Sequence, residues 1–422
     1  MKPLIHAVLT GLFLCTHGCL LAEDWPQWRG PQRNGISQEK GLLKEWPAGG
    51  PKLIWKLSDI GSGYSTPAVA HERLYILSNE GLEKEFVQAI DVADGKKVWS
   101  MTLGKVGNPK QKPSYPAARS TPTIDGDLLF GLSSDGDLAC LSLADGKMRW
   151  QKSLRTDFEG KPGEWAYSES PLVDGEAVIC TPGGSNATMI ALNKKTGAVL
   201  WKSPIPPGDS AAYSSAIVLQ AAGAKQYVQL LQKGLVGVDA NSGKFLWRYN
   251  KPISRFDANI PTPVASDGYI YTASAGTGAG LVQLKSENGK IEPAQVYFES
   301  KLPTAIGGVV KIGDYLYGST GQALLCLDFR TGAVKWEDRA IGAASLCYAD
   351  ERLYLNGENG QVALVEPSPE NYREKGRFAP PDRPQRSNAM EKAWAFPVVA
   401  NGRLYLRDQA MLWCYDVKAP KP

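Results

Sequence analysis

Residues 191–201 read ALNKKTGAVLW, and this short phrase recurs along the chain. It joins an apolar strand to a polar turn, in which a glycine stands four residues after the first polar residue, and then to a second strand that ends in tryptophan. The same arrangement ends at four other tryptophans: Trp99, Trp150, Trp247 and Trp336. Five copies of one phrase predict a repeat protein.

The repeat has a period of about 45 to 50 residues, which is the length of a four-stranded propeller blade. A degenerate copy has Tyr297 where tryptophan is due, and another ends near Phe378. Between the copies, dipeptides such as Asp125-Gly126 and Asn401-Gly402 separate alternating apolar runs. Such dipeptides favour tight hairpins, so each unit is predicted to contain four antiparallel strands.

The last unit, residues 396–417, contains three strands but lacks its tryptophan. Trp55, within residues 52–56, has the pattern of the missing fourth strand. Pairing these two segments would close a ring and leave no open sheet edge. The sequence therefore predicts an all-β, eight-bladed β-propeller over residues 52–417, with an N-terminal extension at 23–51 and a C-terminal tail at 418–422. The blade tryptophans are expected to be structural: Trp55, Trp99, Trp150, Trp201, Trp247 and Trp336.

Residues 1–22 have the layout of a secretory signal peptide: Lys2, an apolar run at 4–14, and Ala22 before an acidic pair. The protein is therefore predicted to be exported, either to the periplasm or to a site associated with the cell envelope. A lipoprotein anchored at Cys19 is the alternative, although the preceding residues are a poor match to a lipobox. No other stretch is long and apolar enough to span a membrane.

The rest of the composition excludes several kinds of site. The formal net charge of +4 is small and dispersed, which argues against nucleic-acid binding. His71 is the only histidine after residue 22 and is expected in a turn, so histidine-based triads and zinc sites are not expected. Cys140, Cys326 and Cys414 take a slot that alanine or glycine fills in other blades, and equivalent slots lie too far apart for disulfides.

The loops that enter the innermost strands are expected to gather around one end of the central channel, here called the mouth. Their residues vary between blades, unlike the framework, which favours a surface shaped for a partner. The candidates for a ligand or partner site are Tyr64, Arg119, Tyr167, Glu169, Tyr213, Asp257, Asn259 and Trp394. Guanidinium and aromatic faces suit either a planar anionic ligand or an inserted peptide. The long connection at 367–392 is either a second binding surface or a tolerated insertion.

The blade phrase resembles the pyrroloquinoline-quinone (PQQ) type repeat. That repeat is shared by quinoprotein alcohol dehydrogenases and by the propeller subunit of the outer-membrane protein assembly machinery (BamB-like). Residues 24–31, DWPQWRGP, and 402–409, GRLYLRDQ, look like signatures of an exported subfamily. An enzyme of this type would hold the quinone near a disulfide between adjacent cysteines and bind Ca²⁺ through Glu, Asn and Asp. Glu169, Asn259 and Asp257 supply these residue types, but no two cysteines are adjacent.

The sequence favours an exported, monomeric, non-catalytic binding or scaffold protein that has no cofactor and no metal. Its protein partner or small ligand is expected at the channel mouth. The alternative is a PQQ- and calcium-dependent dehydrogenase acting on an alcohol, a sugar or polyvinyl alcohol, with Asp257 or Glu169 as the base.

Overall fold

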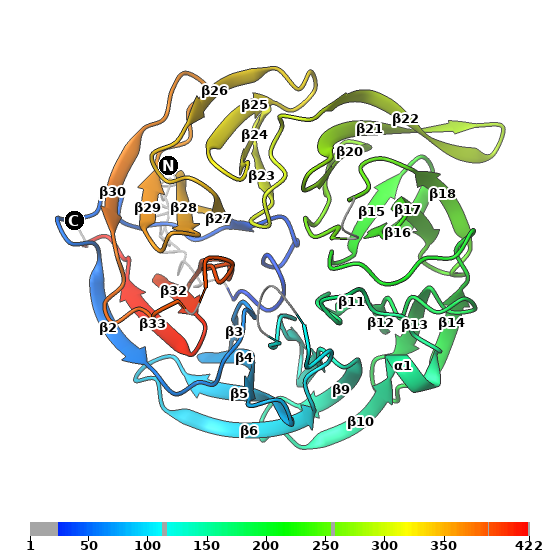
Figure 1. The fold of residues 1–422 in the computed structure, drawn as a ribbon, viewed down its shortest axis with the longest axis horizontal. Coiled ribbons are helices and arrows are strands. Elements are labelled where there is room, and N and C mark those ends of the chain that lie inside the picture. The colour runs from blue at the N-terminus through cyan, green and yellow to red at the C-terminus, as the bar shows by residue number, and fades with distance from the viewer. Residues whose placement is uncertain (1–23, 112–115, 255–257, 387, 421–422) are drawn as a thin grey trace, which may run out of the picture.

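The computed structural model describes residues 24–111, 116–254, 258–386 and 388–420. It contains eight antiparallel sheets of four blade strands each, arranged around a central axis as a ring (Figure 1). This confirms the predicted eight-bladed β-propeller. The described residues include a single short helix, α1 (Leu154–Asp157), at the end of the second blade.

Each blade runs from an inner strand beside the channel to an outer strand at the rim, as the labels in Figure 1 show. Blades 1 to 4 are β3 (Ala68–Ala70), β4 (Arg73–Glu80), β5 (Lys84–Asp91) and β6 (Lys97–Gly104); β7 (Thr123–Asp125), β8 (Leu128–Leu132), β9 (Asp137–Ser142) and β10 (Met148–Ser153); β11 (Leu172–Asp174), β12 (Ala177–Cys180), β13 (Met189–Asn193) and β14 (Val199–Ser203); β15 (Ile217–Ala221), β16 (Ala224–Leu231), β17 (Gly234–Asp239) and β18 (Phe245–Tyr249).

The remaining blades follow the same order along the chain. Blades 5 to 8 are β19 (Val264–Ser266), β20 (Tyr269–Ser274), β21 (Gly278–Glu287) and β22 (Lys290–Glu299); β23 (Val309–Ile312), β24 (Tyr315–Ser319), β25 (Leu324–Asp328) and β26 (Val334–Asp338); β27 (Ala344–Ala349), β28 (Arg352–Gly357), β29 (Val362–Val365) and β30 (Glu374–Phe378); β31 (Val398–Ala400), β32 (Arg403–Asp408), β33 (Met411–Asp416) and β2 (Lys52–Leu57).

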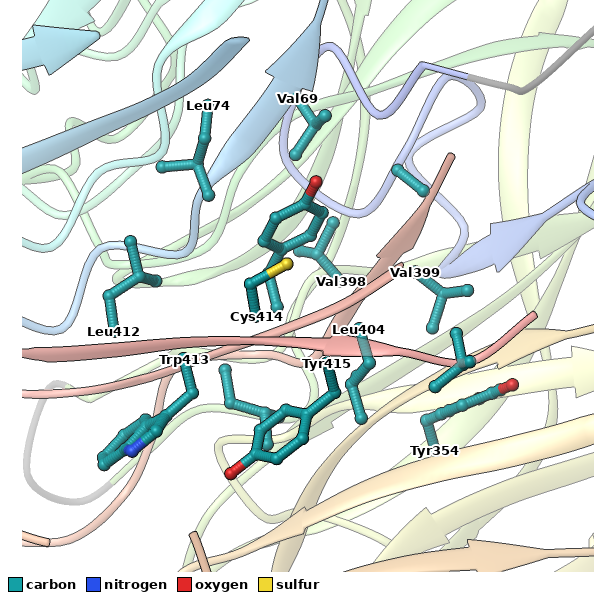
Figure 2. Close-up of a cluster of buried hydrophobic side chains, with 14 of the residues drawn as sticks. Val69, Leu74, Tyr354, Val398, Val399, Leu404, Leu412, Trp413, Cys414 and Tyr415 are labelled. Carbon is teal, nitrogen blue, oxygen red and sulfur yellow. The ribbon is translucent and has the colours of Figure 1, made fainter. Parts of the chain in front are cut away.

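The ring closes where the two ends of the propeller meet. Strand β2 pairs antiparallel with β33, and Trp55 lies opposite Cys414. The N-terminal strand thus completes the C-terminal blade, as the missing tryptophan predicted. A large buried cluster joins blades 7, 8 and 1 at this junction, including Tyr354, Val399 and Leu74 (Figure 2).

The recurring phrase acts across blade boundaries. The Trp99 ring of blade 1 donates a hydrogen bond from Nε1 to the Leu143 carbonyl in the turn of blade 2, at 3.2 Å. A Cβ atom on Gly146 of that turn would lie 2.6 Å from the same ring, and Gly146 has a φ of 72°. Only glycine combines this left-handed conformation with such a close approach. Gly146 therefore makes room for the tryptophan of the preceding blade, and Gly95, Gly197 and Gly243 approach Trp55, Trp150 and Trp201 in the same way.

The same contact recurs around the ring except in blade 4 and in blade 7, whose outer strand ends at Phe378 and carries no tryptophan. Trp55, Trp150, Trp201 and Trp336 donate to carbonyls in the next blade at 2.9, 3.0, 3.3 and 2.7 Å. Tyr297 replaces tryptophan in blade 5 and donates from its hydroxyl to the Phe329 carbonyl. Trp247 differs because its Nε1 donates to Gln226 within its own blade, at 2.5 Å.

The cysteines pack as small core residues. Cys140, Cys326 and Cys414 lie directly opposite Trp150, Trp336 and Trp55, the slot that Ala89 fills opposite Trp99. These three, with Cys180 and Cys347, are buried and free of disulfides in the described residues.

The N-terminal segment, defined here as residues 25–37, crosses the centre of the ring (blue in Figure 1). Trp25 exchanges two backbone hydrogen bonds with Val69 of blade 1, at 2.7 and 2.8 Å. The Pro26 carbonyl accepts from the amide of Ile124 in blade 2. Strand β1 (Ile36–Ser37) adds a fifth, parallel strand to blade 7 through β27. The sequence had not predicted that this segment would occupy the channel.

Two buried arginines fix the same segment. Arg29 Nη2 donates to the Val309 carbonyl of blade 6 at 2.5 Å. Arg33 donates to the carbonyls of Ser170 and Pro171, just before the inner strand of blade 3, at 2.9 and 3.1 Å. Because both side chains are almost fully buried, their Nη groups donate to oxygens of the protein rather than to water, whereas the buried Nε of each has no hydrogen-bond partner among the described residues.

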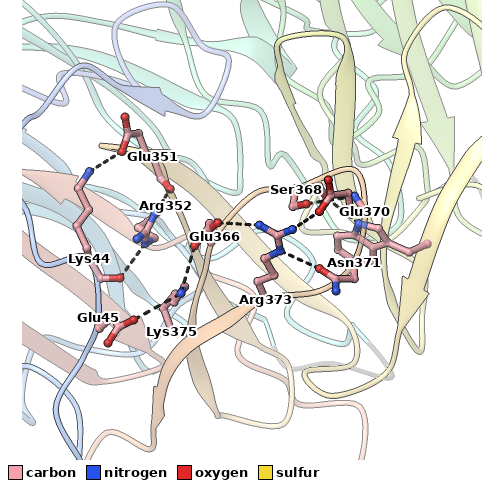
Figure 3. A network of polar contacts seen from close by, with 11 residues as sticks. Lys44, Glu45, Glu351, Arg352, Glu366, Ser368, Glu370, Asn371, Arg373 and Lys375 are labelled. Atoms are coloured by element: carbon pink, nitrogen blue, oxygen red, sulfur yellow. Dashed lines mark hydrogen bonds and ion pairs between the residues drawn. The ribbon is translucent and has the colours of Figure 1, made fainter.

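Residues 42–46 then pass along the outside of blade 7, before β2 begins. Figure 3 shows Lys44 beside Glu351 at 3.2 Å, and the Lys44 carbonyl accepting from Arg352 Nε at 2.8 Å. Lys375 of β30 pairs with Glu366 and Glu45. These ion pairs are partly exposed, so each contributes at most about 1 kcal/mol.

Two predictions fall on residues that the structure does not describe. The signal peptide at 1–22 and the alternative lipid anchor at Cys19 lie outside the described residues. Within the described residues, no helix has the length and apolar character needed to cross a membrane.

Candidate functional site

A pocket of about 250 Å³ lies at the mouth of the channel. Its residues come mainly from the loops that enter the inner strands, together with one residue of the N-terminal segment. This mouth pocket is lined by Trp28, Tyr64, Thr66, Arg119, Trp165, Ser168, Tyr213, Ser215, Ala258, Ile260, Ile306, Met390, Trp394 and Phe396. Because every inner strand borders the channel, loops from blades far apart in sequence converge here.

The N-terminal segment supplies the floor of the mouth pocket. Trp28 Nε1 donates to Thr262 Oγ1 at 2.8 Å, which ties the segment to blade 5. The Trp28 ring meets the Phe396 ring edge to face, with centroids 4.7 Å apart. Arg29 lies 5.5 Å from the centroid of the same phenyl ring. Residues 25–37 thus occupy the channel beneath the pocket.

The walls of the mouth pocket are held by ring contacts. Tyr64 and Trp394 lie with their centroids 5.0 Å apart. The Arg119 guanidinium lies 5.4 Å from the centroid of Tyr64, and its Nη1 donates to the Ala117 carbonyl at 3.0 Å. On the facing wall, the Trp165 amide donates to the Tyr213 hydroxyl at 3.0 Å. These contacts organise the aromatic surfaces before any ligand arrives.

The chemistry of the lining is aromatic and aliphatic, with few polar groups. Arg119 is the only charged side chain among the described residues that line the mouth pocket. Three hydroxyl residues, Thr66, Ser168 and Ser215, complete the polar part. Such a surface can stack on a flat apolar group and attract one negative charge.

Four of the eight predicted mouth residues line the pocket: Tyr64, Arg119, Tyr213 and Trp394. Tyr167 and Glu169 instead lie buried in its wall, with 1% and 3% exposure. The Tyr167 hydroxyl donates to the Pro182 carbonyl at 2.9 Å. Glu169 accepts hydrogen bonds from the Thr181 amide and, at 3.4 Å, from Gln229 Nε2. Asp257 lies outside the described residues.

Asn259 is also a wall residue, and it is fully buried. Its Nδ2 donates to the carbonyls of Leu231 and Gln232 at 2.7 and 3.1 Å. Its Oδ1 accepts from the Ser254 amide and from Ser274 Oγ at 2.9 and 2.6 Å. The amide therefore fastens loops of blades 4 and 5 to each other.

A simple spacing separates pocket residues from wall residues. Each inner strand begins at a recurring step, where proline stands in most blades, and the residue three places before this step lines the pocket in seven blades. These residues are Tyr64, Arg119, Ser168, Tyr213, Ile260, Ile306 and Trp394. Glu169 stands one place later, in the buried position. The sequence reasoning placed Ser168 and Ile306 at the mouth but did not choose them as candidates, and it missed Ile260, which this alignment would have found. It also missed Trp28, Trp165, Met390 and Phe396.

Two buried carboxyl groups lie in the blades around the mouth. Burial raises the pKa of Glu85 to about 7, although hydrogen bonds from Ser134 and the charge of Arg119 act in the opposite direction. The Ser134 amide and hydroxyl both donate to this carboxyl. Burial likewise raises the pKa of Glu169 to about 7. Each group links one blade to the next, since Ser134 belongs to blade 2 and Gln229 to blade 4.

The described residues do not fit the calcium–quinone arrangement that the sequence resemblance implies. The oxygens of Glu169 and Asn259 are engaged by donors inside the wall. No group of three His, Cys, Asp or Glu side chains in the described part of the chain is placed to hold a metal ion. The cysteines of the described part are buried and unlinked, so they do not form the disulfide of the quinoprotein pattern.

Known proteins that resemble this chain include both assembly factors and dehydrogenases. The family described as outer membrane protein assembly factor BamB matches residues 35–164 and 83–338. The BamB protein of Yersinia pestis is 23% identical over 361 residues, covering 80% of this chain and 82% of that protein. BamB of Vibrio cholerae is 24% identical over 314 residues, covering 64% of this chain and 74% of that protein.

Solved structures show the same likeness. BamB from Moraxella catarrhalis superposes with a TM-score of 0.62 at 15% identity, covering 88% of this chain and 98% of that one. Quinohemoprotein alcohol dehydrogenase from Comamonas testosteroni superposes with a TM-score of 0.55 at 12% identity, covering 94% of this chain and 81% of that one. At these identities the likeness concerns the fold, which an assembly factor and a dehydrogenase share.

Proposed function

This chain belongs to the outer membrane protein assembly factor BamB family, and from that premise we propose that it is a non-catalytic scaffold that binds a protein partner at the mouth pocket. The BamB relatives are, by name, factors in outer membrane protein assembly. The PQQ-type repeat predicted from the sequence is the repeat of this family. A role in assembling other proteins of the cell envelope is therefore the natural context for the proposal.

One observation carries the proposal: seven blades place the same loop position in one pocket, and most of these side chains are aromatic or aliphatic. A protein partner is recognised best by rigid aromatic anchors in a preformed hollow, since little side-chain freedom is lost on binding. Tyr64, Trp394, Trp165 and Tyr213 have that character through their mutual contacts.

We also propose where and in what form the protein works. The predicted signal peptide at 1–22 supports export to the periplasm or the cell envelope, with lipid attachment at Cys19 as the alternative. The closed ring supports a monomer, because all four strands of every blade come from the same chain. The scaffold would act without a bound cofactor.

Site-specific photo-crosslinking tests the proposal. Met390 borders the mouth pocket and is 49% exposed, whereas Met148 is 37% exposed on the outer strand of blade 2. A photoreactive residue at each position should give partner crosslinks in intact cells from position 390 but not from 148. Equal crosslinking from both positions, or none from 390, would count against the mouth as the working surface.

The enzyme alternative has a separate test. Purified protein is incubated with PQQ and Ca²⁺, and quinone uptake and dye-linked alcohol oxidation are measured. The scaffold proposal predicts neither uptake nor oxidation. Saturable uptake together with turnover would replace the scaffold with a dehydrogenase.

A further inference from the structure

We propose that Asp408 is a positioning residue of the mouth. Its carboxylate holds the strap, defined here as residues 379–386, across blades 7 and 8, and the strap in turn sets Met390 at the edge of the mouth pocket. Asp408 itself is not one of the lining residues of the pocket. The inference rests on the proposed function, because it names what shapes one side of the proposed partner surface.

The strap lies in the long connection at 367–392. Strand β30 ends at Phe378 on the outer rim, and the next strand, β31, begins at Val398 beside the channel, so the chain between them crosses from rim to centre (Figure 1). The strap makes its first contact with blade 8, where Trp413 Nε1 donates to the Pro381 carbonyl at 3.0 Å. This crossing leads the chain towards the mouth.

Asp408 gathers the two arginines of the strap. It is the last residue of β32 and is 3% exposed. Arg386 donates to it from both Nη atoms, to Oδ1 at 2.8 Å and to Oδ2 at 2.7 Å, and Arg383 Nη2 also donates to Oδ2. Arg383 Nη1 donates to the Gly360 carbonyl, in the turn between β28 and β29. One buried carboxylate thus fastens the strap over neighbouring turns of blades 7 and 8.

This carboxylate controls whether the strap stays in place. Charge-assisted hydrogen bonds are about twice as strong as neutral ones, and a bidentate pair also fixes the orientation of the guanidinium. The side chains of Arg383 and Arg386 are only 17% and 25% exposed. Without the carboxylate, two cations would remain poorly hydrated, and they can reach water only if the strap moves away from the turns.

The mouth pocket is reached four positions after Arg386. Asn388 Oδ1 accepts from the Met390 amide at 2.8 Å, and this turn places Met390, which is 49% exposed, at the pocket edge. Beyond it, the Trp394 carbonyl accepts from Ser345 Oγ at 3.0 Å. Met390 is therefore held between an anchor at the strap and an anchor at blade 7. Because methionine is flexible and apolar, the position of its backbone decides which part of a partner it meets.

Limited digestion of the full-length protein with trypsin tests the hold on the strap. Within the strap trypsin can cut only after Arg386, because proline follows Arg383. Trypsin must take the arginine side chain into its S1 pocket, so Arg386 must first leave Asp408. Asp408→Asn should raise the rate of cleavage after Arg386 about tenfold or more, with cleavage elsewhere in the chain unchanged.

The matched control is Asp382→Asn. Asp382 lies in the same strap and pairs with Lys56, but both side chains are exposed, so this variant should leave cleavage after Arg386 unchanged. An unchanged rate in Asp408→Asn, or an equal rise in both variants, would overturn the inference. If Asp408→Asn fails to fold, Arg386→Lys decides: it keeps the charge and the trypsin site but loses the bidentate geometry, so cleavage after position 386 should still rise. An unchanged rate in Arg386→Lys would then overturn the inference.

A second readout is one that a purely structural role would not move. Positions 390 and 306 both border the mouth pocket, but only position 390 follows the strap. Asp408→Asn should therefore reduce partner crosslinking from a photoreactive residue at 390 much more than from one at 306, and Asp382→Asn should reduce neither. An equal reduction from both positions, or none from 390, would overturn the assignment of Asp408 to the placement of Met390.

The outcome for the inference is separable from the outcome for the scaffold. If the wild-type protein gives no crosslink from position 390, the proposed function fails, whereas cleavage after Arg386 still decides whether Asp408 holds the strap. If position 390 crosslinks and Asp408→Asn changes neither cleavage nor crosslinking, the inference fails and the proposed function stands.

Discussion

Replacing Gly146 with alanine tests whether the recurring phrase works by seating the tryptophan of the preceding blade. Gly146 has a φ of 72°, and an added Cβ would lie 2.6 Å from the Trp99 ring. Gly126, in the same blade, has a φ of 59° and nothing within 4 Å of its Cβ position. The two glycines therefore share the backbone strain and differ in the space around them.

The expected losses follow from this difference. Alanine in the left-handed region costs about 1–2 kcal/mol, which is the whole expected effect of Gly126→Ala. Overpacking against the ring adds about 1–3 kcal/mol, so Gly146→Ala should lower the free energy of unfolding by about 2–5 kcal/mol. Urea unfolding with comparison of m-values measures both.

A second variant tests the cause of the extra loss. In a Trp99→Leu background the ring is absent, so the penalty of Gly146→Ala should fall toward that of Gly126→Ala. The reasoning is refuted if the two glycine variants lose equal stability, or if the extra loss at position 146 persists without the ring.

Two further predictions concern buried groups near the mouth. Burial raises the pKa of Glu85 from 4.5 to about 7. Between these two pH values the folded state therefore binds more protons than the unfolded state. The contribution of Glu85 to the free energy of unfolding falls as the pH rises through this window. The Gln side chain of Glu85→Gln does not titrate, so the free energy of unfolding of this variant should rise relative to that of the wild type by up to about 3 kcal/mol between about pH 5 and about pH 8. Urea unfolding measures this difference, and a pH-independent difference would contradict the prediction. Asn259→Ala should cost about 2–5 kcal/mol of stability, because four buried hydrogen bonds are lost. Ile260→Ala should lower the free energy of unfolding by less than Asn259→Ala does, and it should reduce partner crosslinking from a photoreactive residue at position 390. If Asn259→Ala reduced the crosslinking and Ile260→Ala lowered the stability more, Asn259 would belong to the binding surface.

The blades and the ring closure could be predicted because their signals are local. Four blade boundaries join a tryptophan to a glycine one repeat later, and the turn dipeptides mark the hairpins. Trp55 stood out because the last blade lacked the one residue that every complete phrase carries. The degenerate copy that ends at Tyr297 was also recognisable from its spacing, and in the structure the Tyr297 hydroxyl keeps the hydrogen bond to the next blade.

The N-terminal segment could not be predicted in the same way. Residues 24–31 have no counterpart elsewhere in the chain, so no repeat alignment places them. Their contacts reach residues such as Val309 and Thr262, more than 230 positions away. Buried Arg29 and Arg33 hold this path by donating to backbone carbonyls at blades 6 and 3.

The site was half predictable for a related reason. The entering loops line the mouth pocket, but neighbouring residues of an extended loop point alternately to the pocket and to the wall. Arg119 and Glu169 were therefore grouped together although they stand one place apart relative to the inner strand. Alignment on the step into that strand distinguishes them, and it assigns Ile306 to the pocket.

The most direct test of the central claim is the affinity of the crosslinked partner, once purified, for two matched variants of blade 6. Ile306→Lys introduces a charge into the mouth pocket, and Val334→Lys introduces the same charge at a site that is 47% exposed on the outer strand. Calorimetry should show binding weakened about tenfold or more by Ile306→Lys and unchanged by Val334→Lys. Equal affinity for both variants would contradict the assignment of the mouth pocket as the binding site.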